Sequence, residues 1–240
     1  MQTTGRRERV RQATLTEIRA AARRILIEHG PAAVTINAVA REMGMSGPAL
    51  YRYYASHEDL VAAMVADFYL ELTEVLKGAR DTHAADPPGQ RLLAICRAMR
   101  AWATGHPAEF GRMFASPIPP DQRRPDSPRH QADGDFGHVF LDQFAELWEK
   151  APYPVPAPET LAPSLLTQLR AYCAAHDDRL PPEAAYVMLT CWTRVYGLLC
   201  MEILHQLDFA FSDVEPVFED CLRELCASLG VDYRHPRDHP

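Results

Sequence analysis

The residues best suited to a chemical role lie between Thr35 and Tyr54, and the role that they suit is recognition of a nucleic acid. Arg52 has the one long polar side chain among the residues that a helical pattern here turns outward. A guanidinium can donate to O6 and N7 of one guanine together, which makes Arg52 a candidate for reading a base edge. Arg52 can equally pair with Glu42 or with a phosphate group, and the sequence leaves these alternatives open.

Two short helices and a tight turn must position these residues. Thr35 is a suitable N-cap for the first helix, and Ser46 is one for the second, with Pro48 in its first turn. Gly44 ends the first helix, where a left-handed backbone conformation favours glycine. Such a pair forms a helix-turn-helix, whose second helix enters the major groove of DNA. The inward-facing apolar residues of the pair are Ile36, Val39, Ala40, Met43, Leu50 and Tyr54.

The flanks of the pair carry further signals. Upstream, a helix closes at Gly30 and Pro31, and downstream Ser56 and Asp59 have the spacing of a capping box. The order of a helix ending in glycine, then T-I-x-x-V-A, G-M-S, L-Y-R-Y-Y and S-H-E-D-L, resembles the N-terminal domain of TetR-family transcriptional regulators. The resemblance runs from about residue 18 to residue 60 and implies DNA binding.

The resemblance also implies roles for single residues. Tyr51 and Tyr53 match positions whose hydroxyls hold the DNA backbone in the family, and Thr35 lies at a helix N-terminus that suits a phosphate. His57 departs from the family, which usually carries a phosphate-binding lysine there, so we expect a weaker contact. Pro48 offers the groove floor only an apolar contact. The expected DNA-binding residues are Thr35, Ser46, Gly47, Pro48, Tyr51, Arg52, Tyr53 and His57.

Charge is divided unevenly along the chain. Residues 1–56 hold nine arginines and four glutamates, a balance of +5, and the −7 of the whole chain leaves −12 for the remainder. A basic end on an acidic body is typical of a phosphate-binding head joined to a body that does not bind DNA. We expect residues 1–11 to be disordered in the free protein, either as an arm that contacts DNA or as a solvated tail. Its arginines are Arg6, Arg7, Arg9 and Arg11.

The predicted fold is all-α. A first helix from about Thr14 to His29 completes a three-helix head, so residues 1–56 form the predicted DNA-binding domain and residues 57–240 an effector-binding and dimerisation domain. A long helix from His57 to about Gly78 spans ~30 Å and can join the two; in the family it transmits ligand binding to the head. Residues 118–135 lack periodicity and are expected to form an exposed, mobile loop. Further helices are expected at 90–105, 106–117, 136–150, 158–175, 183–207 and 214–229.

The last two helices carry extra apolar residues. The helix at 183–207 is apolar over most of its circumference and must be covered on several sides. We expect both helices to form the interface of a two-fold homodimer, the alternative being that a single core buries them. Residues 192–202 are similar to a Trp-x-x-x-His-Gly-x-x-x-x-Glu pattern of one class of TetR-family C-terminal domains, and residues 101–114 resemble a segment of the same class. Tyr196 stands where that pattern has histidine, so the role of that imidazole is not transferable.

Many aromatic and methionine side chains in the body could line an effector pocket. Pockets for apolar or aromatic ligands are lined in this way, although each residue taken singly could be plain core. Tyr69, His106, Tyr172 and Tyr196 could orient a ligand. The candidate pocket residues are Met64, Phe68, Met99, Trp102, Phe110, Met113, Phe114, Phe140, Phe144, Trp148, Trp192 and Tyr196.

The sequence lacks the signatures of an enzyme. It has no nucleophile elbow, phosphate loop, zinc spacing or dinucleotide fingerprint, and we expect no catalytic residue, cofactor or metal. Its six cysteines are expected to be small core residues, the alternative being a metal or redox site. With no apolar run of 18 residues and no signal core, we expect a cytoplasmic protein. The prediction is a ligand-responsive repressor on a palindromic operator; the alternative is a helical carrier or interaction module that has lost DNA binding.

Overall fold

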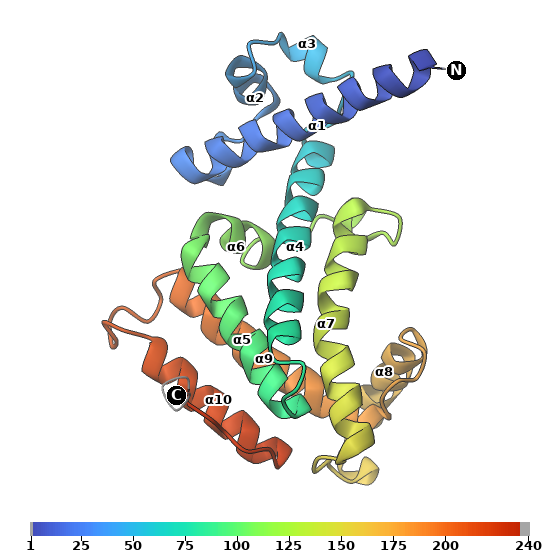
Figure 1. Ribbon diagram of the computed structural model, residues 1–240, viewed down its shortest axis with the longest axis vertical. Coiled ribbons are helices and arrows are strands. Elements are labelled where there is room, and N and C mark those ends of the chain that lie inside the picture. Colours follow the sequence, from blue (N-terminus) through green and yellow to red (C-terminus); the bar gives the residue numbers. More distant parts are fainter. Residues whose placement is uncertain (1, 236–240) are drawn as a thin grey trace. The chain divides into compact units, whose positions relative to one another are not determined.

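The computed structural model describes residues 2–235, without the side chains of residues 2–4 and 121. In this range the chain forms ten α-helices and three short 3-10 helices and no strand, which confirms the predicted all-α fold (Figure 1). It divides into two compact units, one made of Met1–Leu72 with Gly105–Phe136 and the other of Thr73–Thr104 with Gly137–Pro240. The boundaries between these units fall after Leu72, Thr104 and Phe136.

The first unit contains the head. Helix α1 spans Gln2–His29, the 3-10 helix η1 spans Pro31–Ala33, α2 spans Ile36–Glu42 and α3 spans Gly47–Leu50. Helix α2 packs on both α1 and α3, and Figure 1 shows α2 and α3 on one side of α1. Burial of one apolar face from each helix stabilises the head, at about 25 cal/mol per Å² of apolar area. The buried residues include Ile18, Ala22, Leu26, Ile36, Val39, Ala40, Leu50 and Tyr54.

The N-terminal segment corrects the expected disorder of residues 1–11. Helix α1 begins at Gln2, well before the predicted start at Thr14. Arginine and glutamate are good helix formers, and the Gln12 amide donates to the Glu8 carboxylate one turn earlier at 2.8 Å. The absence of apolar periodicity here therefore reflects a helix that is exposed all round, not an absence of helix.

The rest of the first unit is built from α4, α6 and the start of α7. Helix α4 spans His57–Thr82, α6 spans Pro107–Phe114 and α7 spans Pro128–Lys150, with the 3-10 helix η2 at Pro120–Arg123. The expected mobile loop at residues 118–135 is therefore wrong over its second half. The prediction failed because it assumed that the polar residues of this segment are solvated. Gln122 and Arg129 are instead buried and hydrogen-bonded.

The second unit is a helical body. Helix α5 spans Pro88–Gly105, α8 spans Pro163–Ala174, α9 spans Pro182–Ile203 and α10 spans Glu215–Leu229, with η3 at Pro158–Thr160. Helix α9 packs against α8 and α10. Two bidentate ion pairs join α5 to these late helices, Arg100 with Glu202 and Arg97 with Glu219. The apolar core includes Leu93, Cys96, Met99, Val139, Leu169, Met188, Val195, Leu199, Phe218 and Leu222.

Helix α9 is long and apolar enough to cross a membrane by length and composition alone, contrary to our expectation that no such run exists. Its contacts within the second unit explain part of this apolar composition. Its buried residues, such as Ala185, Met188 and Leu199, contact the rest of the second unit, and Glu202 near its end is paired with Arg100. Its apolar composition thus follows partly from burial among helices.

Candidate nucleic-acid interface

The helix-turn-helix has the local geometry that its sequence predicts. The Thr35 hydroxyl accepts a hydrogen bond from the Ala38 amide at 3.1 Å, which caps α2. Gly44 has φ +63°, the left-handed conformation that a side chain rarely adopts. Ser46 occupies the N-cap position of α3 in an extended conformation, but its hydroxyl makes no capping hydrogen bond. That hydroxyl is exposed, as a phosphate contact requires.

The recognition helix is short and lies close to α2. Its regular part covers only Gly47–Leu50, and Tyr51, Arg52 and Tyr53 continue it as turns. A Cβ atom on Gly47 would lie 2.8 Å from Oδ1 of Asn37, so a larger residue could not stand there without displacing the Asn37 side chain. Gly47 therefore leaves room for the present position of the Asn37 side chain.

The outer surface of the head presents the predicted contact residues. Tyr51 is 54% exposed, and Arg52 and Pro48 are exposed as well. Tyr53 is partly buried. Among the described residues Arg52 has no hydrogen bond or ion pair, and Glu42 pairs with Arg24 at 3.1 Å. The pair of Arg52 with Glu42, one of the alternatives open to it, is therefore not formed in this structure.

His57 has a role that the sequence did not indicate. Its Nε2 lies 2.7 Å from the carbonyl oxygen of Val34, to which Nε2–H donates, and this bond ties the first residue of α4 to the loop before α2. Ser56 caps the same helix by accepting from the Asp59 amide at 3.0 Å, as predicted. With one ring nitrogen committed to the backbone, His57 supports the fold of the head at the position where the family carries lysine.

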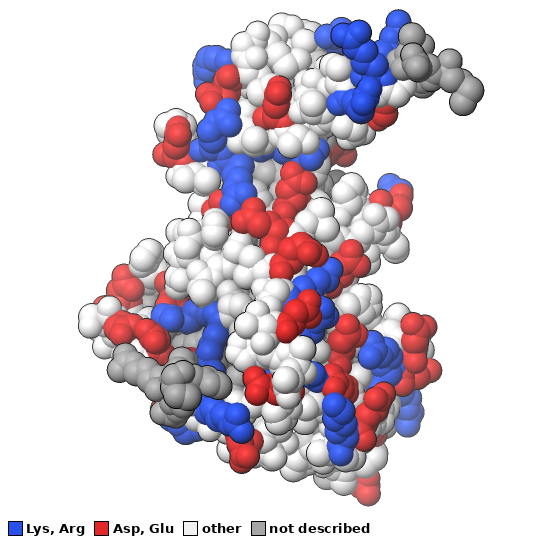
Figure 2. Space-filling view, in the orientation of Figure 1, with Lys and Arg blue, Asp and Glu red and all other residues white. Residues whose placement is uncertain are grey.

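Positive charge gathers on the head (Figure 2). The four arginines at the start of α1, Arg6, Arg7, Arg9 and Arg11, are all exposed on a helix rather than on a disordered arm. Ordered helical geometry places them at i, i+1, i+3 and i+5. A cationic surface of this kind attracts a phosphate backbone by screened long-range electrostatics.

Two further arginines of α1 hold the head to helices that follow it. The Nε atom of Arg19 donates to Oδ2 of Asp67 on α4 at 2.5 Å. One turn later, Nη1 of Arg23 donates to Glu71 on α4 at 2.6 Å and Nε of Arg23 donates to Glu109 on α6 at 2.8 Å. Glu109 is buried. These positive charges are neutralised inside the protein and are not part of the DNA-binding surface.

Two of the candidate effector residues of the first unit, Phe110 and Phe114, belong to a cluster of aromatic rings. The rings of Phe110 and Phe114 lie 4.7 Å apart, and Phe114 lies 5.5 Å from Tyr69 and 5.6 Å from Phe136. Burial raises the pKa of Tyr69. Phe136 was not among the predicted pocket residues, whereas Tyr69 was predicted as a residue that could orient a ligand. The fully buried candidates of the first unit are Met64, Phe68, Phe110 and Met113.

The candidates of the second unit fall into separate groups. The Phe140 ring lies 5.4 Å from Trp192, which lies 5.6 Å from Tyr196. Phe144 and Trp148 instead contact Tyr153, whose ring lies 6.0 Å and 5.1 Å from theirs. The structure therefore brings only part of the predicted set together within this unit. Met99 and Trp102 are buried on α5.

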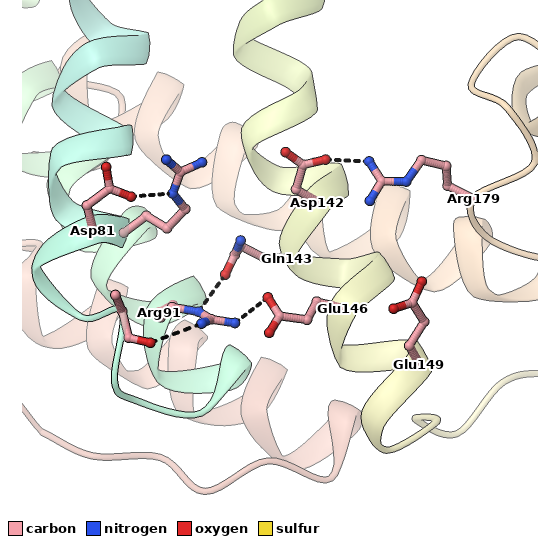
Figure 3. Close-up of a pocket in the computed structure, with 9 residues that line it drawn as sticks. Asp81, Arg91, Asp142, Gln143, Glu146, Glu149 and Arg179 are labelled. Atoms are coloured by element: carbon pink, nitrogen blue, oxygen red, sulfur yellow. Dashed lines mark hydrogen bonds and ion pairs between the residues drawn. The ribbon is translucent and has the colours of Figure 1, made fainter.

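The second unit also has an open cleft of about 490 Å³ with charged walls (Figure 3). Arg91 enters it, donating to Oε1 of Gln143 at 3.0 Å and to the Ala84 carbonyl at 3.3 Å and pairing with Glu146. Across the cleft, Arg179 donates to Asp142 at 2.5 Å. Its charges are largely paired with one another, which does not suit the apolar effector predicted from the sequence.

Most of the cysteines lie in the core. Cys96, Cys173, Cys191 and Cys226 are buried as predicted, whereas Cys200 and Cys221 are only partly buried, and all six are free thiols. Burial raises the pKa of the Cys191 and Cys226 thiols to about 11, so both stay protonated and unreactive at neutral pH. Within the described part of the chain, no three histidine, cysteine or acidic side chains are grouped so as to hold a metal ion.

A helix-turn-helix with an exposed arginine and tyrosine on its outer surface, carried by an all-helical body, defines the class of helix-turn-helix transcriptional regulators. Comparison with known proteins identifies the family. Residues 18–64 match bacterial regulatory proteins of the tetR family, and residues 92–225 match the tetracyclin repressor-like C-terminal domain. The chain belongs to the TetR family and is a DNA-binding transcriptional regulator, not an enzyme.

Similar proteins agree with this assignment. The HTH-type transcriptional regulators Rv1816 of Mycobacterium tuberculosis and Mb1846 of Mycobacterium bovis are each 28% identical over 230 residues, covering 94% of this chain and 96% of theirs. The solved structure of a regulatory protein designated SCO4313 is 27% identical, with a TM-score of 0.67 over 92% of this chain and 98% of that one. Thermus thermophilus FadR, a TetR-family repressor solved with lauroyl-CoA, shares the fold at 14% identity and a TM-score of 0.58, over 94% of this chain and 100% of its own.

Proposed function

We propose that this protein is a cytoplasmic repressor that binds a palindromic operator as a homodimer and leaves it when a small apolar or aromatic effector binds. The observation that carries sequence-specific binding is Arg52. This side chain is exposed at the end of the recognition helix and has no partner among the described residues, so its fork of donors is available to a guanine. Tyr51, Tyr53, Thr35 and Ser46, on the same head, are candidate phosphate contacts.

The proposed dimer uses α9. Residues spaced at i, i+3, i+7, i+11 and i+14 lie on one side of a helix, and on α9 this side remains exposed or partly exposed. Gly197 lies in its middle with open space over its Cα, which allows a second helix to approach closely. Met201 is 40% exposed and Leu204 is 45% exposed. The residues of this surface, which we name the α9 surface, are Thr190, Thr193, Gly197, Met201 and Leu204.

A dimer can recognise a longer DNA sequence than a monomer. One short recognition helix contacts too few base pairs for useful selectivity. Two recognition helices about one turn of DNA (~34 Å) apart read a palindrome. An effector can release the dimer only if it binds the DNA-incompetent arrangement of the heads more tightly than the competent one. The candidate pocket residues that lie together within the first unit, Phe110 and Phe114, offer apolar surface for such a ligand.

Selection from a random DNA pool tests the DNA-binding proposal. We expect the full-length protein to enrich a palindrome and to bind it with an affinity that falls steeply with salt. Tyr51→Ala should weaken that binding strongly, while Tyr186→Ala, on a partly buried position of α9, serves as a control for loss of a tyrosine. No enriched sequence, or binding insensitive to salt, would favour the alternative carrier that has lost DNA binding.

The dimer is tested by its mass in solution. Gly197→Arg places a long charged side chain in the middle of the α9 surface and should convert a dimer to a monomer by light scattering. Gly78→Arg on α4 is the matched control, since Gly78 also has open space around it and lies outside that surface. A reporter gene placed behind the selected operator then separates a repressor, which lowers its expression, from an activator.

A further inference from the structure

Two histidines from different elements lie against each other in the second unit. The ring of His138, on α7, and the ring of His176, in the turn after α8, have their centres 5.8 Å apart. His138 is exposed and makes no hydrogen bond within the described part of the chain, so neither of its ring nitrogens is committed to the protein. Because neutral imidazole is the commonest metal ligand among side chains, such a pair is a candidate metal site.

The hydrogen bond of His176 fixes which of its nitrogens carries the proton. Its Nδ1 lies 2.8 Å from the carbonyl oxygen of Tyr172, one turn earlier on α8, and because a carbonyl oxygen can only accept, Nδ1–H is the donor. The neutral ring then has its lone pair on Nε2, which has no partner among the described residues. Histidines that bind metals are usually oriented in this way, with the other ring N–H donated to a carbonyl or carboxylate.

The His176 ring is also held in position by its surroundings. The Tyr172 ring lies 4.3 Å from it at an interplanar angle of 31°. After His176 the backbone is left-handed at Asp177, with φ 56°, and at Asp178, with φ 50°. This conformation is costly for residues with a side chain and persists where the surrounding structure fixes it. His176 is therefore preorganised, which lowers the cost of binding an ion.

A second contact joins α7 to the same turn. Asp142 follows His138 by one turn of α7 and accepts a hydrogen bond from Arg179 at 2.5 Å (Figure 3). This ion pair keeps the two imidazoles together without a metal. The charge of Asp142 is offset by Arg179, whereas the exposed carboxylates of Asp177 and Asp178 have no ion-pair partner among the described residues. The local charge therefore favours a cation.

We propose that His138 and His176 together bind one divalent transition-metal ion such as Zn²⁺ or Ni²⁺. Two imidazoles that bind Zn²⁺ tetrahedrally at ~2.1 Å have ring centres about 5 Å apart, so a small rotation of the exposed His138 is sufficient. No group of three histidine, cysteine or acidic ligands occurs among the described residues, so water completes the coordination. The sequence did not indicate this pair, because the two histidines are far apart in the chain.

The chemistry of the two ligands selects the ion. Imidazole nitrogen suits zinc, nickel and copper, whereas Mg²⁺ and Ca²⁺ prefer oxygen ligands. A bound ion bridges α7 and the turn after α8, in addition to the pair of Asp142 with Arg179. This site is separate from the DNA-binding head and from the proposed effector residues, so its test is independent of both.

Calorimetric titration measures the metal site. ZnCl₂, NiCl₂ and MgCl₂ are titrated separately into the full-length protein, which is purified without a histidine tag and freed of metal by a chelator that is then removed. We expect zinc and nickel to bind and magnesium not to bind. No binding of zinc or nickel by the wild type overturns the proposal.

Variants locate the site. His138→Ala and His176→Gln should each weaken zinc binding at least about ten-fold, since loss of a ligand costs no less than loss of an outer-shell partner. Glutamine at 176 keeps a donor for the Tyr172 carbonyl, and His138 is exposed, so both variants should fold. His130→Ala, which removes another exposed histidine of α7, should bind zinc like the wild type. Undiminished binding in either His138→Ala or His176→Gln overturns the site.

Thermal unfolding gives a second measurement on the same preparations. Zinc should raise the unfolding midpoint of the wild type and of His130→Ala, because an ion that binds the folded state stabilises it by mass action. The same zinc concentration should leave the midpoints of His138→Ala and His176→Gln unchanged. A rise that persists in either of these two variants would contradict a shared ion.

Discussion

The Nε atom of Arg23 on α1 lies 2.8 Å from Oε1 of Glu109 on α6, and this pair connects residues 86 positions apart in the chain. Glu109 is buried, with its side chain 3% exposed, whereas Arg23 is also shared with Glu71 on α4. Arg23 of the head is therefore bound to both α4 and α6. Removing it would leave a buried carboxylate without its cation.

Arg23→Met should lower the free energy of unfolding by about 3 kcal/mol, because a buried charge that loses its partner pays its desolvation cost alone. Arg24→Met, at the next position, is the matched control. Arg24 pairs with Glu42 on the surface, where such pairs contribute about 0–1 kcal/mol. Urea unfolding at a fixed protein concentration measures both. Equal, small effects would show that the Arg23 pair contributes no more than a surface pair.

Gly44→Ala should destabilise the protein by about 1–2 kcal/mol, since its φ of +63° is costly for a residue with a Cβ atom. Gly78→Ala on the exposed side of α4 should do the opposite and stabilise by about 0.5–1 kcal/mol, because alanine is the better helix former. Thermal unfolding compares the two. A Gly44→Ala protein as stable as Gly78→Ala would contradict the turn geometry, and Gly44→Asn should lie between.

Glu219 gives a pH-dependent contribution to stability. Burial alone would raise its pKa, but hydrogen bonds from Arg97 and Tyr233 outweigh burial and hold the pKa below its ordinary 4.5. The folded protein therefore releases this proton more readily than the unfolded chain, so the contribution is complete above the ordinary pKa and is lost as the pH falls through the folded value. Glu219→Gln should destabilise the protein at pH 7 and flatten the acid side of its stability curve.

Glu224→Gln on the same helix is the control for that experiment. Glu224 is exposed and pairs with Arg194, so its loss should change stability little at either pH. Urea midpoints between neutral pH and pH values below 4.5 measure both variants. If the stability of Glu219→Gln fell with decreasing pH as steeply as that of the wild type, the pH dependence would come from other carboxylates.

Arg52→Ala should reduce discrimination rather than general affinity. Loss of a bidentate contact to guanine should weaken the binding free energy for the selected sequence by about 1–3 kcal/mol. It should change the binding of unrelated DNA little. Tyr51→Phe, which loses a hydroxyl predicted to hold the backbone, should weaken both DNAs equally. Fluorescence anisotropy with the two duplexes separates these patterns. If Arg52→Ala weakened the binding of both duplexes equally, Arg52 would contact a phosphate rather than a base.

Short-range chemistry made the head predictable from sequence. A capping side chain bonds a backbone amide about three residues away, and a glycine in the left-handed conformation affects only its own position. The apolar positions of a helix recur every three or four residues. Thr35, Gly44 and the Ser56–Asp59 cap accordingly form as predicted. The same signals predicted the all-helical fold and the outward position of Arg52, because each depends on neighbours in the chain.

Long-range contacts decided what the sequence could not. Residues 118–135 look like a solvated loop, yet Gln122 and Arg129 are buried there, because their acceptors come from residues up to 64 positions away. His57 is tied to the carbonyl of Val34, and Arg23 to Glu109. Whether a polar side chain is solvated or buried depends on which distant groups the fold brings to it, and no local pattern records them.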